Sequence, residues 1–152
     1  MRHSRMVRLT AGQIFTYSNL LVMPAWALLI LFPKWKWTRV LAAYLTPAIL
    51  AAAWIVITID RFTPVGGGLG SLTQVQEMLL DPWFVVAGWQ HALILDLFIG
   101  AWEVRDAQRL GITHGYVIPC LLLTFLAGPV GLIAYFVIRV LVIRRWPWNS
   151  AK

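Results

Sequence analysis

The chain has 152 residues, of which 60% are hydrophobic and 12% are charged. Soluble domains carry about 25% charged residues, so this composition excludes an ordinary water-soluble protein. The net charge of +7 does not indicate a nucleic-acid partner, because the basic residues stand in short segments beside long apolar ones. The composition indicates an integral membrane protein that contacts membrane lipids.

Four apolar segments are long enough to cross a bilayer as helices: residues 14–32, 40–59, 83–102 and 116–138. A helix needs about 20 apolar residues to cross a hydrocarbon layer of about 30 Å. The first segment carries a polar run, "TYSN", near its N-terminal end. The predicted fold is therefore all-α and polytopic, a single domain over residues 1–152 that forms a bundle of four transmembrane helices.

The flanks of these segments predict an orientation. Because residues 14–32 are followed at once by a second span, they do not resemble a cleaved signal peptide. If all four spans cross straight, both termini and the second loop share one side, and that side carries the larger number of Lys and Arg residues. Cytoplasmic flanks are enriched in Lys and Arg, so we expect both termini in the cytoplasm.

The second loop contains a helix signal of its own. Ser71 followed by Gln74 resembles a capping box, and Leu72, Val75 and Met78 would share one face of the helix that follows. We expect a short amphipathic helix that lies on the membrane surface or over the mouth of the bundle. A passive connector is the alternative.

The fourth span is interrupted at "AGPVG", which contains Gly128, Pro129 and Gly131. Proline removes a backbone donor, and the carbonyl freed by it must be satisfied by protein or water. Small residues also let a neighbouring helix approach closely. An antiparallel pairing of the third and fourth spans places Gly128 opposite His91 and Thr124 opposite Asp96.

The third span carries ionisable residues on one side, although its sequence "WQHALILDLFIG" is almost wholly apolar. Asp96 and Glu103 fall on one helix face, and Asp106 lies between them and His91. An ionisable residue at this depth costs about 2.5 to 3.5 kcal/mol and normally faces the bundle interior. These ionisable side chains either fix only the helix packing through hydrogen bonds, or they perform acid/base chemistry in an apolar cavity.

The spacing of these side chains does not favour a metal or haem site. Asp96 and Glu103 lie about 10 Å apart along a helix axis at 1.5 Å per residue. There is no two-His helical motif, and His91 and His114 would differ in depth by about 20 Å. We expect no organic cofactor and no metal, with a metal as the less favoured alternative.

Several longer stretches, taken together, carry a family resemblance. They are "LLVMPAWALLILFPKW", "DPW", "GWQHALILDLFIGAWEVRDAQRLGITH" and "PCLLLTFLAGPVGLIAYFVIR", spread from Leu20 to Arg139. This series resembles the abscisic-acid-deficiency-four-like family of small four-span membrane proteins. Its plant members are associated with the conversion of violaxanthin to neoxanthin in plastid membranes. We expect no plastid transit extension, so the chain resembles the bacterial-type members, and this resemblance implies a bacterial cytoplasmic membrane.

The resemblance implies a lipophilic ligand, a carotenoid or related isoprenoid, and a redox-neutral reaction. Opening a xanthophyll epoxide to an allenic alcohol needs an acid for the epoxide oxygen and a base for a proton of the polyene, so no redox cofactor is required. On this chemistry Asp96 is the acid, His91 its partner or the base, and Glu103 with Asp106 the polar mouth of the site. The candidate substrate-binding residues are Trp89, Thr124, Gly128, Pro129 and His114.

Three classes of function stay open at the level of the sequence. The first is a cofactor-independent isomerase of a carotenoid or isoprenoid. The second is a non-catalytic binder of a lipophilic pigment, and the third is a structural or accessory membrane protein whose polar residues fix helix packing. A homo-oligomer is compatible with all three. A transporter is less favoured because no inverted repeat is visible.

Overall fold

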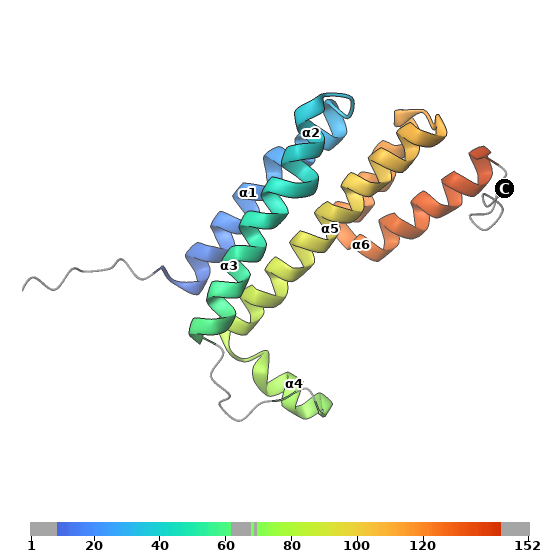
Figure 1. The fold of residues 1–152 in the computed structure, drawn as a ribbon. Coiled ribbons are helices and arrows are strands. Elements are labelled where there is room, and N and C mark those ends of the chain that lie inside the picture. The colour runs from blue at the N-terminus through green and yellow to red at the C-terminus, as the bar shows by residue number, and fades with distance from the viewer. Residues whose placement is uncertain (1–8, 62–67, 69, 144–152) are drawn as a thin grey trace, which may run out of the picture.

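The computed structural model describes residues 9–61, 68 and 70–143. These residues form helices and no strand, in the order α1 (Ala11–Leu31), α2 (Lys36–Val40), the π-helical turn η1 (Leu41–Leu45), α3 (Thr46–Arg61), α4 (Leu72–Met78), α5 (Pro82–Leu110) and α6 (His114–Ile143) (Figure 1). Because α2, η1 and α3 follow one another directly, the described chain has four helices long and apolar enough to cross a membrane: Ala11–Leu31, Lys36–Asp60, Pro82–Leu110 and His114–Val142. The predicted all-α membrane bundle is confirmed.

Local signals in the sequence explain where the main helices begin and end. The Thr10 side chain accepts a hydrogen bond from the backbone of Gln13, whose side chain accepts one from the backbone of Thr10 in return, so α1 begins with a capping box. Asp81 caps α5 through the backbone N–H of Trp83 at 2.8 Å. Gly111 ends α5 with a φ of 70°, a left-handed conformation that glycine adopts without a steric penalty.

Helix α5 is the central helix of the bundle. It packs against α1 and α3 and against α6, which covers a different part of its surface (Figure 1). The apolar core gathers along it and includes Trp26 and Leu29 of α1, Leu97 of α5 and Leu121 of α6. Every candidate residue of the third span therefore lies on a helix whose faces are divided between different neighbours.

Helix α6 does not run straight. Ala127 has a φ of −156° and a ψ of 76°, outside the helical region, and divides α6 into a first arm, 114–126, and a second arm, 128–143. The first arm runs antiparallel to α5, so that Thr124 contacts Glu103. The expected register placed Thr124 opposite Asp96 instead, because it centred the turn on residue 110 rather than after Gly111.

The second arm of α6 turns back along α5. Tyr135 and Arg139 both contact Asp106, which lies nearer to the C-terminal end of α5 than Asp96 does. A straight helix would have carried Tyr135 and Arg139 toward the opposite end of α5. Helix α6 is therefore a helical hairpin, and both of its arms lie beside the C-terminal half of α5 (Figure 1).

The sequence "AGPVG" accounts for this bend. Pro129 cannot donate a backbone hydrogen bond, so the helix is weakest here. A Cβ atom added to Gly128 would overlap the carboxyl group of Asp96, and one added to Gly131 would overlap the hydroxyl and backbone of Thr124. Only glycine at both positions permits the two arms and α5 to approach this closely.

The bend separates the two ends of the described chain. Helix α1 begins at the end of the bundle that carries α4, which we call the α4 end, and it finishes at the opposite or α2 end (Figure 1). Helix α6 finishes on the α2 side, beyond the contact between Arg139 and Asp106. The expectation that both termini lie in the cytoplasm concerns residues 1–8 and 144–152, which lie outside the described residues, so it stays a prediction.

The predicted short helix of the second loop is present as α4. The Ser71 hydroxyl accepts a hydrogen bond from the backbone of Gln74 at 3.3 Å. The helix contains no buried residue, and Leu72 is 75% exposed. Helix α4 stands beyond the ends of α3 and α5 rather than within the bundle (Figure 1).

Candidate functional site

Two regions of the bundle combine groups that could bind or transform a ligand. One is a polar cluster between α5 and the two arms of α6, formed by Glu103, Asp106, Thr124, Tyr135 and Arg139. The other is an apolar groove between α1 and α3, with α5 at its base. The sequence predicted part of the first. It led us to expect an apolar groove open to lipid, but not its position between α1 and α3.

Glu103 is the most deeply buried acid in the described chain, with 0% exposure. The Thr124 hydroxyl donates a hydrogen bond to its Oε1 atom at 2.9 Å. Its Oε2 atom is buried and has no hydrogen-bond partner among the described residues. A carboxyl group with one unsatisfied oxygen in an apolar region is destabilising, so it calls for either a ligand or a functional reason.

Asp106, one turn further along α5, is by contrast well satisfied. Its Oδ2 atom accepts hydrogen bonds from the Tyr135 hydroxyl and from Nε of Arg139, both at 2.8 Å. Its Oδ1 atom accepts one from Arg109 at 3.2 Å, although the Arg109 side chain is 73% exposed and contributes less. Asp106 is therefore an anchor for the second arm of α6, and its expected role at the mouth of a site stays a prediction.

The proposed acid and base do not meet in the structure. Asp96 is half-buried and lies against Gly128, where the second arm of α6 begins. His91 lies on an exposed part of α5. No hydrogen bond joins their side chains in the described part of the chain. Gly128, which the expected register placed opposite His91, lies against Asp96 instead.

The remaining candidate residues connect α5 and α6 to α1. The indole nitrogen of Trp89 donates to the Asn19 side chain at 3.1 Å, and the Trp89 ring lies 5.4 Å from that of Phe15. The Nε2 atom of His114 lies 2.9 Å from the backbone carbonyl of Ile30. Both contacts fix the position of α1, and the structure does not gather these side chains around one cavity.

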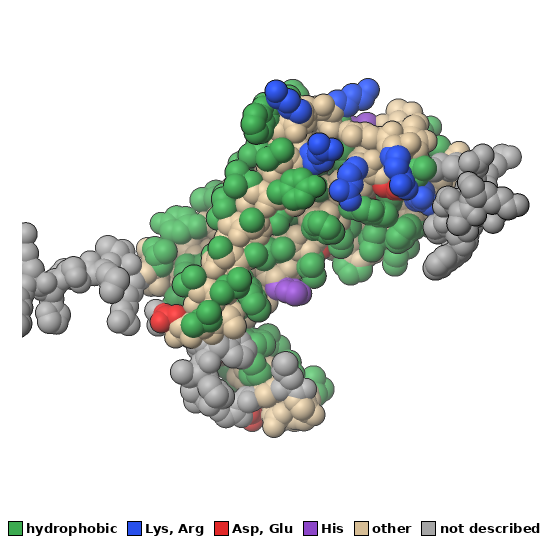
Figure 2. All heavy atoms as spheres, in the orientation of Figure 1, with side chains coloured by type: hydrophobic (Ala, Val, Ile, Leu, Met, Phe, Trp, Pro, Cys, Tyr) green, Lys and Arg blue, Asp and Glu red, His purple; other side chains and the backbone are tan. Residues whose placement is uncertain are grey.

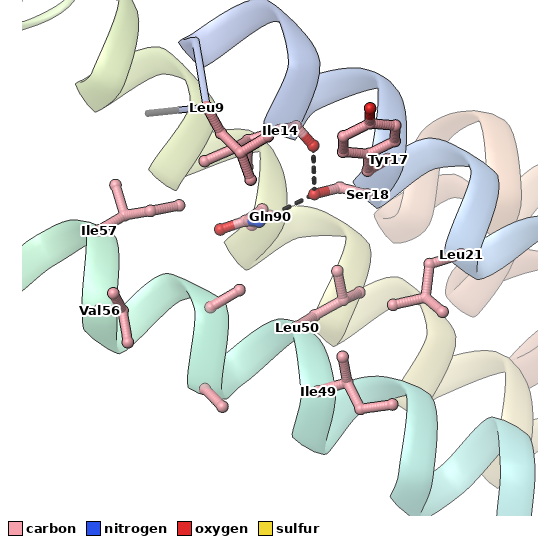
Figure 3. A pocket seen from close by; sticks show the side chains of 12 residues that line it. Leu9, Ile14, Tyr17, Ser18, Leu21, Ile49, Leu50, Val56, Ile57 and Gln90 are labelled. Carbon is pink, nitrogen blue, oxygen red and sulfur yellow. Dashed lines mark hydrogen bonds between the residues drawn. The ribbon is translucent and has the colours of Figure 1, made fainter. Parts of the chain in front are cut away.

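The apolar groove has a volume of about 460 Å³ and lies between α1 and α3 (Figure 3). Its lining is almost entirely hydrocarbon and consists of Leu9, Ile14, Tyr17, Ser18, Leu21, Ile49, Leu50, Ala52, Ala53, Val56, Ile57 and Gln90. Several of these side chains are also exposed at the surface of the bundle, among them Val56 at 64% and Tyr17 at 54%. The groove is therefore open on the side that a bilayer would cover.

Gln90 supplies the buried polar group at the base of this groove. Its side-chain nitrogen donates to the Ser18 hydroxyl at 2.8 Å, and Ser18 donates in turn to the backbone carbonyl of Ile14 at 2.8 Å (Figure 3). Gln90 is only 1% exposed, and its Oε1 atom has no hydrogen-bond partner among the described residues. Gln90 thus places one buried, unsatisfied acceptor among the residues that line the groove.

A comparison with protein families matches the chain over residues 13–135 to the model described as ABA DEFICIENT 4-like. The chain belongs to the ABA DEFICIENT 4-like family. The match confirms the resemblance seen in the sequence, and it covers both carboxyl groups of the polar cluster, the bend of α6 and every lining residue of the groove except Leu9. Comparison with curated proteins gave no match, and neither did comparison with solved structures.

In this ABA DEFICIENT 4-like chain the position of the groove does not follow from the ionisable residues, because its buried polar side chains, Gln90 and Ser18, are neutral. Two signals were nevertheless visible: an amide next to His91 inside an apolar span, and the "TYSN" run that contains Ser18. In hydrocarbon such neutral polar side chains hydrogen-bond across helices, so each predicts a partner on another span.

A metal site does not emerge from the geometry of the described residues. No group of three or more His, Cys, Asp or Glu side chains converges closely enough there to hold an ion. The described side chains of the two regions offer hydrogen bonding in the groove and carboxyl groups in the polar cluster.

Proposed function

We propose that this protein binds a lipophilic molecule of the carotenoid or isoprenoid class in the groove between α1 and α3, within a bacterial cytoplasmic membrane. The volume of about 460 Å³ falls in the usual range of small-molecule sites, about 300 to 1,000 Å³. The apolar lining suits a polyene or isoprenoid chain. Because the exposed lining residues face the side that lipid would cover, such a molecule can enter from the bilayer without crossing water.

The unsatisfied oxygen of Gln90 carries this proposal. A buried acceptor without a partner costs about 1 to 3 kcal/mol, and a ligand hydroxyl would remove that cost. The expected ligand is therefore apolar along most of its length and carries a hydroxyl group at one end, as xanthophylls do. The family match supports a ligand of this class, since plant members are associated with xanthophyll conversion.

The test is to identify what the protein retains. The chain is purified from a bacterial host that makes both a hydroxylated carotenoid and its hydroxyl-free parent, and the bound molecules are extracted and quantified. We expect the hydroxylated form to be enriched on the protein. Replacing Gln90 with Leu should lower that enrichment about fivefold, the value of one hydrogen bond of about 1 kcal/mol. Gln76→Leu, on the exposed surface of α4, is the matched control.

A second variant tests the groove itself. Ala53→Trp places a large side chain in the groove and leaves Gln90 and Ser18 themselves unchanged, and it should abolish retention of both carotenoids. Wild-type protein that elutes without either pigment, or an Ala53→Trp variant that retains as much as wild type, would sink the proposal.

A second candidate function is the redox-neutral isomerisation of a molecule of the same class. The observation that favours it is Oε2 of Glu103, a buried carboxyl oxygen that no described group satisfies. In this reaction an acid donates a proton to the epoxide oxygen as the C–O bond breaks, and a base accepts a proton from the polyene to form the allene. Asp96, His91, Glu103 and Asp106 are the candidates for these two roles.

The isomerase is tested in a host supplied with an epoxy-carotenoid. Glu103→Gln and Asp96→Asn each keep the shape of the side chain and remove its acidity. We expect at least one of them to abolish the allenic product while the level of folded protein stays unchanged. If both variants form as much allenic product as wild type, Glu103 and Asp96 are not the catalytic acids, and only the binding function remains.

A further inference from the structure

The Lys and Arg side chains that the structure describes gather at one end of the bundle. Figure 2 shows them at the α2 end, above the apolar surface of the long helices. They come from the α1–α2 connection, α2, the last turns of α5 and the second arm of α6: Lys34, Lys36, Arg39, Arg105, Arg109 and Arg139. Two contacts hold these segments together, since Gln108 donates to the carbonyl of Pro33 at 2.7 Å and Arg139 binds Asp106.

The acidic side chains of the described chain show the opposite distribution. Asp60 at the end of α3, Glu77 of α4 and Asp81 before α5 lie at the α4 end. Two other carboxyl groups, Glu103 and Asp106, stand near the basic end but are buried, at 0% and 6% exposure. The exposed charge at the α2 end is therefore positive throughout the described residues.

The hairpin of α6 creates this distribution. With four straight crossings, Arg139 would lie on the opposite side of the membrane from Arg109. In the structure both bind the same carboxyl group of Asp106, so they lie on one side. At 1.5 Å per residue the arm over 114–126 is about 20 Å long and the arm over 128–143 about 24 Å, each shorter than a hydrocarbon layer of about 30 Å.

We propose that the basic α2 end is a surface for anionic phospholipid head groups of the cytoplasmic leaflet, and that α6 enters and leaves the bilayer on that same side. The anionic charge of that leaflet attracts clustered Lys and Arg residues beside membrane spans. Trp35 and Trp37, each 49% exposed at this end, suit the boundary between head groups and hydrocarbon. Helix α1 then begins on the opposite, non-cytoplasmic side.

The orientation is tested by labelling single cysteines in a Cys120→Ala background with a membrane-impermeant maleimide. Cysteine replaces Lys34 at the α2 end or Thr73 on α4, and a third variant has a cysteine appended after Lys152. We expect Thr73→Cys to react in intact cells, and the other two to react only in inside-out vesicles. If the appended cysteine reacts from the same side as Thr73→Cys, α6 crosses the membrane and the re-entrant arrangement is wrong. If Lys34→Cys reacts in intact cells, the basic end faces away from the cytoplasm and the proposal is wrong.

The lipid partner is tested by quantifying phospholipids that co-purify after reconstitution in an equimolar mixture of phosphatidylglycerol and phosphatidylcholine. We expect phosphatidylglycerol to be enriched on the wild-type protein, and the triple variant Lys34→Gln/Lys36→Gln/Arg39→Gln to lose at least half of that enrichment. Glu77→Gln, at the α4 end, should leave it unchanged. Equal enrichment in wild type and triple variant would overturn the assignment of this surface.

Discussion

Glu103 and Asp106 stand one turn apart on α5, and each holds a different arm of α6. Glu103 accepts a hydrogen bond from Thr124 on the first arm, and Asp106 accepts from Tyr135 and Arg139 on the second. The hairpin is thus fastened to the central helix by two buried carboxyl groups. Both oxygens of Asp106 accept hydrogen bonds, which fits a structural role. Oε2 of Glu103 has no partner among the described residues, and packing alone does not explain that.

Because Asp106 anchors the second arm of α6, Asp106→Ala and Arg109→Ala should lower the free energy of unfolding by very different amounts. Asp106→Ala leaves the guanidinium of Arg139, whose side chain is only 12% exposed, without its partner, and should lower the free energy of unfolding by about 3 kcal/mol. Arg109→Ala removes only an exposed partner and should cost less than about 1 kcal/mol. Denaturant titration in detergent micelles measures both. Equal losses would mean that the second arm is held by something other than Asp106.

The contact between Gly128 and Asp96 predicts a coupled pair. Gly128→Ala places a methyl group where the Asp96 carboxyl lies and should destabilise the protein by about 1 to 3 kcal/mol. Adding Asp96→Ala creates the missing space, so the double variant should be more stable than the sum of the single changes predicts. Gly115→Ala is the control, because nothing lies within 4 Å of its added Cβ atom and alanine favours a helix. Additive losses at Gly128 and Asp96 would contradict the contact.

Much of this fold can be predicted from the sequence, because hydropathy, caps and breakers act locally. The cap at Asp81, the stop at Gly111 and the short helix after Ser71 are all found where their residues indicate. The break at Pro129 is visible too, but the direction in which α6 continues is not. That direction depends on Gly131 packing on Thr124 and on the anchoring of the second arm by Asp106, both of which are tertiary contacts.

The candidate site is predicted less completely for a related reason. Helical periodicity places Asp96, Glu103 and Asp106 on one side of α5. In the structure Glu103 and Asp106 are buried and Asp96 is half-buried. Periodicity cannot show that Asp106 is saturated by partners while Glu103 keeps a free oxygen, because those partners come from α6. The role of Gln90 in the groove cannot be predicted from the sequence, because it rests on a side-chain oxygen that lacks a hydrogen-bond partner in the fold.

The two histidines named from the sequence should behave differently when removed. His114→Ala loses the contact with the carbonyl of Ile30 and should cost about 1 kcal/mol of folding free energy. His91 is exposed and makes no hydrogen bond within the described residues, so His91→Ala should change stability by less than about 0.5 kcal/mol. Thermal unfolding of both variants in one detergent checks this. A strong loss of stability in His91→Ala would show that His91 has a partner in the assembled protein.

Joint replacement of Glu103 and Thr124 tests whether Glu103 serves a function or only helix packing. Replacing both partners of a buried polar pair by apolar groups of similar shape is often neutral or stabilising, whereas removing one partner alone is costly. Glu103→Met/Thr124→Val should therefore unfold at the same or a higher denaturant concentration than wild type. Thr124→Val alone leaves both oxygens of Glu103 without a hydrogen bond and should lower the free energy of unfolding by about 1 to 3 kcal/mol.

The same double variant also tests the role of Glu103 in the membrane. If Glu103 serves proton exchange, Glu103→Met/Thr124→Val will be stable and will retain pigment in the groove, but it will form no allenic product from an epoxy-carotenoid. The groove lies on the α1 and α3 side of α5, so retention provides a readout that the substitution does not disturb. A stable double variant with full turnover would instead make Glu103 a packing residue, and the acid would have to be sought at Asp96.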